Sequence, residues 1–184
     1  MISKFILKLI GWKNIVSYPL HNLDKYLVIV IPHTSNWDFP LGLLSRAAIK
    51  EDIKYLGKDS LFRFPFGFLF RWLGGYPVVR SKSTNYVETV VNLFNSKKRF
   101  AVCIAPEGTR KKVDKLKSGF YYMAHGANIP LILCSFDWKK KEIKYSEPFY
   151  TSGNYESDLP KIMKYFNGVE GKNPDDGINF NVQD

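Results

Sequence analysis

The sequence has little with which to cross-link itself, coordinate a metal or cross a membrane. Its 184 residues include only two cysteines and three histidines. Cys103 and Cys134 each stand inside an apolar run, so no disulfide framework is expected and a reduced, intracellular setting fits better. The cysteines and histidines have no zinc-ligand spacing, and no apolar run approaches the ~20 residues of a membrane-spanning helix. We therefore expect neither a metal site nor a transmembrane segment.

Several common catalytic signatures are also missing. There is no Gly-x-Ser-x-Gly elbow, no Walker A loop and no Gly-x-Gly-x-x-Gly fingerprint. The sequence therefore lacks the usual signals of serine hydrolases, P-loop enzymes and dinucleotide-binding enzymes. Acidic residues are few, with 17 Asp and Glu against 27 Lys and Arg, a net charge of +10. Such a surface attracts nucleic acid, anionic lipid headgroups or a phosphorylated substrate. The basic residues are spread along the chain without a nucleic-acid-binding motif, so we do not expect nucleic acid as a partner.

Apolar and aromatic residues are plentiful. Hydrophobic residues make up 45% of the chain and aromatic residues 16%, which is enough for one sizeable core. No repeat and no Ser/Gly/Pro-rich linker divides the chain. We therefore treat residues 1–184 as a single domain, with an irregular tail at 168–184.

Short β-branched runs alternate with stretches of helical spacing. The predicted strands are 27–31, 53–56, 76–79, 100–105, 129–136 and 142–145. The predicted helices are 41–50, 61–73, 85–96, 118–126 and 158–166. This order is typical of an α/β domain with a mostly parallel central sheet flanked by helices, and the turn at 139–141 predicts an antiparallel strand late in the chain.

Two segments carry apolar residues beyond the needs of a small core. Residues 1–18 are predicted to hold an amphipathic N-terminal helix, because apolar and lysine side chains alternate with helical spacing over 1–13. That stripe suits packing on the domain and binding to a membrane surface equally well. Residues 61–73 include five phenylalanines and a tryptophan. A helix that is apolar on nearly every side leaves surface over for an acyl chain, a bilayer or another subunit.

Binding sites of parallel sheets collect at the carboxyl ends of strands. Here that rule selects the segments 32–38, 80–82 and 106–110. All three carry polar and titratable side chains, and their convergence is better explained by a binding site than by solvation.

His33 and Asp38 form the first candidate pair. If His33 lies in the loop and Asp38 in the first helical turn, the carboxylate reaches one imidazole nitrogen and leaves the other to act as a general base. Ser35 followed by Asp38 also resembles a helix capping box. The alternative is a surface histidine beside a helix-capping aspartate.

The second candidate group combines Glu107, Gly108, Thr109 and Arg110 with Arg80. Two guanidinium groups at neighbouring strand ends suit a phosphate. The alternative is a polar turn in which Glu107 and Arg110 neutralise each other. Cys103 lies within a predicted buried strand and is expected to belong to the core.

Taken in order, these residues resemble the glycerolipid acyltransferases related to 1-acylglycerol-3-phosphate acyltransferase. The resemblance covers residues 27–136 and rests on four blocks: His33-x4-Asp38, Gly75-Tyr-Pro-Val-Val-Arg80, Ala105-Pro-Glu-Gly-Thr-Arg110 and Ile129-Pro-Leu-Ile-Leu. Lys58 is similar to a lysine that the family places between the first two blocks. Pro32, Val79 and Ala105 depart from residues common in the family.

The resemblance implies an acyltransferase that moves a fatty acyl group from an acyl-CoA or acyl carrier protein thioester to the hydroxyl of a lysolipid, foremost 1-acylglycerol-3-phosphate. It implies His33 as general base and Asp38 as its support. Lys58, Arg80, Glu107, Gly108, Thr109 and Arg110 would bind substrate. No cofactor beyond the thioester co-substrate is implied.

The expected location is the cytoplasm, peripheral on the inner face of an anionic cell membrane. The departures from the family blocks leave the acceptor open, including a non-phosphate acceptor such as a lyso-aminolipid. A non-catalytic lipid- or phosphate-binding protein on the same fold is the other alternative.

Overall fold

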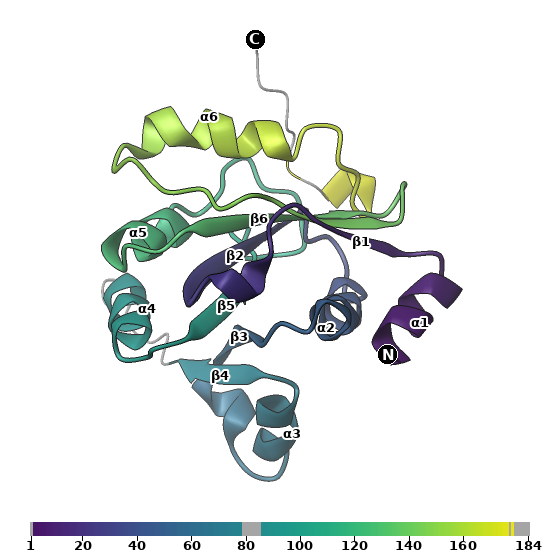
Figure 1. Ribbon diagram of the computed structural model, residues 1–184, viewed down its shortest axis with the longest axis horizontal. Coiled ribbons are helices and arrows are strands. Elements are labelled where there is room, and N and C mark those ends of the chain that lie inside the picture. Colours follow the sequence, from purple (N-terminus) through teal and green to yellow (C-terminus); the bar gives the residue numbers. More distant parts are fainter. Residues whose placement is uncertain (1, 79–85, 177, 179–184) are drawn as a thin grey trace.

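A seven-stranded sheet runs through the centre of the computed structural model, which describes residues 2–78, 86–176 and 178 (Figure 1). Its strands are β1 (Lys13–Val16), β2 (Lys25–Ile31), β3 (Ile53–Lys58), β4 (Gly75–Val78), β5 (Phe100–Ile104), β6 (Leu131–Asp137) and β7 (Glu142–Tyr145). The helices are α1 (Ile2–Leu9), α2 (Asp38–Ile49), α3 (Gly67–Trp72), α4 (Tyr86–Asn95), α5 (Gly119–Gly126) and α6 (Tyr155–Tyr165). Short 3-10 turns are η1 (Leu20–Asn22), η2 (Asp59–Phe62) and η4 (Pro174–Asp176).

The strand order is β1-β7-β6-β2-β5-β3-β4. The five strands from β6 to β4 pair in parallel, β7 pairs antiparallel with β6, and β1 runs parallel to β7. The predicted α/β class, with a mostly parallel sheet and a late antiparallel strand, is confirmed. The parallel pairing aligns the carboxyl ends of β2, β3, β5 and β6 at one edge.

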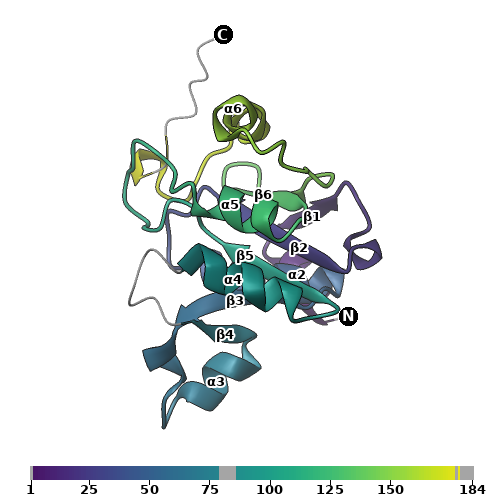
Figure 2. The same cartoon turned by 90° about the vertical axis from the view of Figure 1, so that its left-hand side faces the viewer.

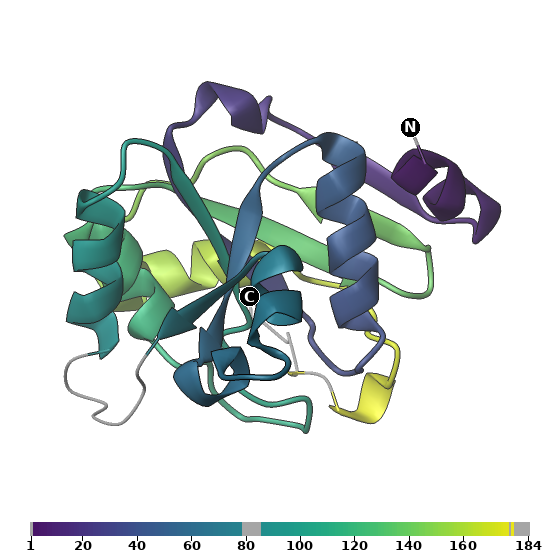
Figure 3. The ribbon, with the colours of Figure 1, turned by 90° about the horizontal axis from the view of Figure 1, so that it is seen from below.

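The central strand β2 is buried on both faces. Leu27, Ile29 and Ile31 point into the core shared with α4, α5 and α6. Tyr26, Val28 and Val30 point into the core beneath α1 and α2. The unbroken apolar run follows from this two-sided burial, because each alternate side chain meets a helix layer. Figures 2 and 3 show the helices on the two sides of the sheet.

The N-terminal helix is shorter than the expected 1–18. It ends at Leu9, and Gly11 adopts a positive φ of 80°, which favours glycine and stops the helix. The chain then forms β1, which pairs with β7 about 130 residues later in the sequence. Four residues with mixed exposure carry little strand signal of their own, so this edge strand depends on its distant partner.

The aromatic segment is not the single helix predicted over 61–73. It forms η2, a break at Pro65 and the short helix α3. Proline cannot donate the backbone hydrogen bond that a continuous helix requires, and its ring blocks the preceding turn. The tail predicted to be irregular includes the η4 turn, and its residues 170–173 pack beside the loop that follows β2.

Candidate active site

The site lies where the carboxyl ends of β2, β5 and β6 meet. The loop 32–38 follows β2, the turn 105–110 follows β5, and Trp138 follows β6. These strands are neighbours, so segments separated by 74 and 100 residues in sequence are brought within hydrogen-bond distance. The convergence expected for the segments after β2 and β5 is therefore observed.

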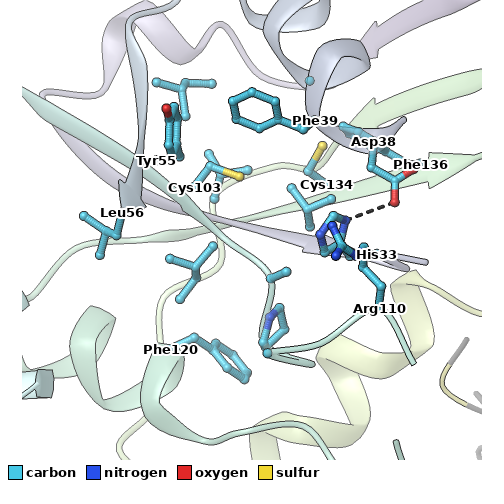
Figure 4. Close-up of a pocket in the computed structure, with 18 of the residues that line it drawn as sticks. His33, Asp38, Phe39, Tyr55, Leu56, Cys103, Arg110, Phe120, Cys134 and Phe136 are labelled. Carbon is cyan, nitrogen blue, oxygen red and sulfur yellow. Dashed lines mark hydrogen bonds and ion pairs between the residues drawn. The ribbon is translucent and has the colours of Figure 1, made fainter. Parts of the chain in front are cut away.

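His33 and Asp38 are in direct contact. The His33 Nδ1 atom lies 3.0 Å from Asp38 Oδ2, and Figure 4 shows the two side chains joined at the edge of a cavity. The His33 side chain is 26% exposed, whereas the Asp38 side chain is 2% exposed. A carboxylate that holds Nδ1–H fixes the tautomer in which the Nε2 lone pair is free to take a proton. The pair has the geometry of a supported general base.

The backbone around Asp38 holds its carboxylate in place. Asp38 Oδ2 accepts hydrogen bonds from the backbone N–H groups of Thr34, at 3.0 Å, and Ser35, at 2.9 Å. The Ser35 bond is one half of the capping box expected from the sequence. The Ser35 hydroxyl instead accepts from the Trp37 N–H. The start of α2 also favours a negative charge there, because its free N–H groups point toward the loop.

Trp138 supplies a donor to the other oxygen of that carboxylate. Its indole Nε1–H donates to Asp38 Oδ1 at 2.8 Å. Trp138 is not among the site residues predicted from the sequence, although it follows β6 as His33 follows β2. The rule that binding sites lie at the carboxyl ends of strands also points to Trp138. From the sequence, the connection from β6 to β7 is interpreted only as a hairpin turn.

Glu107 is buried behind the loop. It is 4% exposed, and both of its carboxylate oxygens lie 3.1 Å from the backbone N–H of His33. Burial raises the pKa of Glu107 to about 7, although the His33 N–H and nearby imidazole oppose the shift. Glu107 is not among the described residues that line the cavity. Its geometry supports the backbone of His33 rather than contact with a ligand.

Gly108, Thr109 and Arg110 are exposed and line the cavity. Arg110 Nη1 donates to the Asn36 side-chain oxygen, and Figure 4 shows Arg110 beside His33. Among the described ion pairs, none joins Arg110 to Glu107. The mutual neutralisation considered above therefore does not occur. Gly108 has a φ of 68°, and a Cβ there would meet the Lys117 side chain at 2.5 Å.

The cavity beside His33 has a volume of about 1,200 Å³. Its residues come from both faces of the sheet. Beneath α2 they include Phe39, Gly42, Leu43, Val28, Val30, Cys134 and Phe136, and toward α5 they include Ile104, Phe120 and Met123. These residues are apolar. Of the polar residues that line the cavity, His33, Asn36, Thr109 and Arg110 belong to the two site loops, whereas Arg46 and Lys54 belong to α2 and β3. A cavity of this kind suits a long apolar group with a polar head.

Cys103 lines the same cavity, but its environment does not favour nucleophilic chemistry. Burial raises the pKa of the Cys103 thiol to about 12, so the thiol stays protonated at neutral pH. The prediction that Cys103 is a core residue agrees with this setting.

For two of the predicted binding residues the structure does not describe the side chain. Arg80 lies outside the described residues. Lys58 ends β3 at the same edge of the sheet, but its side chain is not part of the described structure.

Within the described ranges, no group of three or more His, Cys, Asp or Glu side chains is arranged to hold a metal ion. Over the same residues, no helix combines the length and apolar character needed to cross a membrane.

The fold and site define an α/β protein with a histidine–aspartate pair at the mouth of an apolar cavity. A family profile described as Acyltransferase matches residues 14–137, and the chain belongs to that family. Over 170 residues the chain is 36% identical to a Caenorhabditis elegans protein provisionally named 1-acyl-sn-glycerol-3-phosphate acyltransferase acl-1. This match covers 85% of the chain but 63% of the length of that relative. No solved structure matches the chain at a significant level.

Proposed function

We propose that the protein transfers a fatty acyl group from an acyl-CoA or acyl carrier protein thioester to the hydroxyl of a lysolipid, foremost 1-acylglycerol-3-phosphate. The observation that carries the proposal is the 3.0 Å contact between His33 Nδ1 and Asp38 Oδ2 at the edge of a large apolar cavity. Family membership and the similarity to the nematode protein support it.

His33 acts on the acceptor hydroxyl. Its Nε2 atom takes the hydroxyl proton as the oxygen attacks the thioester carbonyl, and Asp38 stabilises the imidazolium that forms. A C–O bond forms, the C–S bond breaks, and the imidazolium returns its proton to the leaving thiolate. A thiol with a pKa near ~8.5 leaves without a strong acid, so one base is sufficient. No acyl-enzyme is required, in keeping with the protonated thiol of Cys103.

Arg110 and its neighbours bind the acceptor headgroup. The exposed Arg110 stands beside His33 without a carboxylate partner among the described ion pairs, and its planar fork suits a phosphate. Thr109 offers a hydroxyl, and Gly108 lets the ligand approach the backbone. Arg80 and Lys58 are assigned to substrate by their positions in the family blocks, with Lys58 a candidate donor to the oxyanion. Glu107 acts indirectly, through the backbone of His33.

The proposed substrates favour action at a membrane surface. A lysolipid and an acyl thioester both carry long chains, and the net charge of +10 favours an anionic surface. Helix α1 leaves Ile2, Phe5 and Leu9 more than half exposed, beside Lys4 and Lys8, as interfacial helices do. We place the protein at the cytoplasmic face of the cell membrane, peripheral and attached to lipid. Deleting residues 1–10 is expected to weaken flotation with anionic vesicles.

The decisive test is acyl transfer by the purified protein. Radiolabelled acyl-CoA and acyl carrier protein donors are offered with 1-acylglycerol-3-phosphate, other lysophospholipids and a lyso-aminolipid, and His33→Ala is assayed alongside. A positioned general base contributes about 10²–10⁴-fold, so His33→Ala is expected to lose at least that factor while keeping its fold.

Each outcome has a distinct meaning. Transfer that disappears in His33→Ala establishes the reaction and names the acceptor. Transfer at the wild-type rate in that variant contradicts the role of His33. Tight lysolipid binding without transfer from any donor supports a binding protein instead.

A further inference from the structure

The segment 59–73, called the aromatic protrusion below, stands apart from the body of the domain. In Figures 1 and 2, α3 and the turn before it project beyond β4 at the free edge of the sheet. Phe62 fastens its base, because this ring is 5% exposed and fills the space over Gly57 and Gly75. Arg71 adds a 3.0 Å hydrogen bond from Nη1 to the Phe62 carbonyl. Arg46 of α2 and Tyr55 of β3 also donate hydrogen bonds to the carbonyls of Leu73 and Phe70. The protrusion is therefore held in a defined position on the sheet.

Phe70 packs on the Phe62 ring and is half-buried, as is Leu73. Six other large apolar side chains of the protrusion are exposed. Their exposed fractions are 97% for Phe64, 78% for Trp72, 73% for Phe68, 64% for Phe66, 46% for Leu61 and 39% for Leu69. A soluble monomer rarely gathers so much apolar surface in one place. Burying a side chain of this size is favourable by roughly 1.5–3 kcal/mol. The surface is accordingly suited to an apolar environment outside the protein.

The charges around this surface favour an anionic lipid bilayer as that environment. Arg63 is well exposed on the protrusion, where it also pairs with Asp59, and Arg71 lies near its base. The loop after β5 adds exposed basic side chains at Arg110, Lys111, Lys112, Lys115 and Lys117, against one exposed carboxylate, Asp114. Arg110, Lys111 and Lys117 line the cavity. Tryptophan and phenylalanine beside basic residues are the side chains that settle at a membrane interface.

The cavity reaches the strand from which the protrusion grows. Lys54, Tyr55 and Leu56 of β3 line it, and β3 leads directly into the protrusion. Across from β3, Phe39 of α2 packs edge-on against Tyr55, with ring centroids 5.0 Å apart. Tyr55 links the two regions directly, because it lines the cavity and donates from its hydroxyl to the Phe70 carbonyl of the protrusion at 3.2 Å.

We propose that the aromatic protrusion inserts its exposed side chains into the interface of an anionic bilayer, beside the entrance of the cavity. This inference rests on the proposed function only for the identity of the lipid that moves from the bilayer into the cavity. It places the main insertion point at residues 59–73 rather than at α1.

Vesicles of phosphatidylcholine and phosphatidylglycerol test the insertion with the full-length chain. The double variant Phe64→Ser/Phe68→Ser is compared with the control Tyr122→Ser/Tyr150→Ser, which removes two exposed aromatic rings from outside the protrusion. The protrusion variant is expected to lose about 10-fold or more in vesicle partitioning, and the control less than 2-fold. Equal losses would overturn the proposal. So would a wild-type dimer that the protrusion variant dissociates, because a second copy would then cover this surface.

Brominated lipids locate the inserted residue. Quenching of tryptophan fluorescence is expected to fall by more than half in Trp72→Phe, which retains an apolar ring and still binds. Undiminished quenching would point to Trp37, which is 62% exposed in the site loop, and would contradict insertion of the protrusion. Acyl transfer to a short-chain, monomeric lysolipid should change less than 2-fold in the protrusion variant. If no variant or wild-type protein transfers acyl groups but quenching follows Trp72, the insertion stands and the acyltransferase proposal fails.

A separate observation concerns Trp138. Its indole Nε1–H is the donor to Asp38 Oδ1, whereas His33, Thr34 and Ser35 all bond to Oδ2. Three further contacts hold Trp138, two of them at its ring. The ring packs edge-on against Trp12 at 5.0 Å, Lys172 Nζ lies 4.9 Å from its centre, and the Trp138 backbone N–H donates to the Glu170 carbonyl.

The geometry points to Trp138 as a positioning residue for the histidine–aspartate pair. The bond to Oδ1 fixes the rotation of the Asp38 carboxylate, and that rotation directs Oδ2 at the imidazole. Trp138 is not among the described residues that line the cavity, so it has no direct contact to offer substrate. The inference rests on the proposed role of His33.

Trp138→Phe removes the N–H while keeping an aromatic ring. We expect kcat to fall about 10-fold with KM within 2-fold of wild type, and Trp138→Phe/Asp38→Asn to be no slower than Asp38→Asn alone. Trp12→Phe is the matched control for packing around the ring, and it should leave kcat within 2-fold. Additive losses in the double variant, or equal losses in the control, would contradict the positioning role.

A low-field proton resonance from His33 Nδ1–H provides a readout that does not require turnover. Trp138→Phe is expected to shift this resonance and Trp12→Phe to leave it in place. An unchanged resonance in Trp138→Phe overturns the inference. If instead the resonance shifts but Asp38→Asn transfers acyl groups at the wild-type rate, the contact to Trp138 is real and the proposed role of the pair is wrong.

Discussion

Soluble proteins usually bury apolar side chains and expose polar ones. The site loop 32–38 and the aromatic protrusion 59–73 depart from this pattern in opposite directions. In the loop, Thr34, Ser35 and Asp38 are polar and at most 8% exposed. In the protrusion, Phe64 is apolar and 97% exposed. Both segments follow parallel strands and begin at the same edge of the sheet. The difference lies in their partners. The loop's polar side chains have partners from distant parts of the chain, whereas most apolar side chains of the protrusion are exposed, and the protrusion is held by the buried Phe62 and by hydrogen bonds to its backbone.

Both departures are unfavourable in free energy, and a segment that served only the fold would avoid them. Burying a carboxylate is unfavourable unless several donors compensate, and Asp38 has four. Exposing aromatic rings is unfavourable unless another phase covers them. The loop is therefore organised for chemistry inside the protein, and the protrusion for contact outside it.

The largest effect is expected when the buried carboxylate loses its charge. Asp38→Asn keeps the size of the side chain, but its NH₂ group cannot accept from the donors that surround Asp38, and the imidazole loses the support for its proton. We expect kcat for acyl transfer to fall about 10³–10⁴-fold with a small change in KM, measured at saturating donor. A loss below 10-fold would show that the buried carboxylate serves the fold alone.

The next largest effect is the difference in unfolding free energy between two variants of the protrusion, one at the buried Phe62 ring and one at the exposed Phe64 ring. Phe62→Ala should lower the free energy of unfolding by about 3–5 kcal/mol, because the ring fills the space over two glycines. Phe64→Ala should change it by less than about 0.5 kcal/mol, because the side chain is 97% exposed. Urea unfolding of both variants measures the difference. Similar losses would mean that Phe64 has a partner within the protein.

Glu107, which supports the backbone of the site loop, should make the stability of the protein depend on pH. Burial raises its pKa from 4.5 to about 7, so between these values the folded protein binds a proton that the unfolded chain has released. The contribution of Glu107 to stability is full below pH 4.5 and is lost as the pH rises through 7.

Glu107→Gln should abolish that slope, because a neutral amide still accepts from the His33 N–H. From pH 4.5 to pH 8 the variant should therefore gain on the order of 3 kcal/mol relative to wild type. Urea unfolding of both proteins at the two pH values provides the difference. A constant difference would show that the carboxyl group titrates normally.

The smallest effect is expected at the contact between the tail and the site loop. A Cβ on Gly171 would lie 2.6 Å from Thr34 Oγ1 and 2.8 Å from Thr34 Cγ2. Gly171→Ala should cost about 1–3 kcal/mol of stability by displacing the tail. Adding Thr34→Ala removes the clashing atoms, so the double variant should be more stable than the sum of the single losses predicts. Strict additivity in thermal unfolding would indicate that the tail moves freely.

Much of the fold could be predicted because its signals are local. The apolar run of β2 and the helical spacing of α4 and α5 identify elements that the structure contains. The predictions were wrong where a distant partner or a single ring decided the conformation. Strand β1 exists because β7 lies beside it, and the break at Pro65 divides what periodicity alone makes one helix.

By itself the sequence determined the class of fold, the edge of the sheet that carries the site and the pairing of His33 with Asp38, because five residues of loop and helix cap bring these two together locally. Only the tertiary structure decided that Glu107 turns toward the His33 backbone, that Trp138 donates to the Asp38 carboxylate, and that Phe64, Phe66 and Phe68 face outward while Phe62 is buried. Those arrangements depend on contacts between segments far apart in the chain, and no local pattern of residues encodes which face of a side chain a distant neighbour will cover.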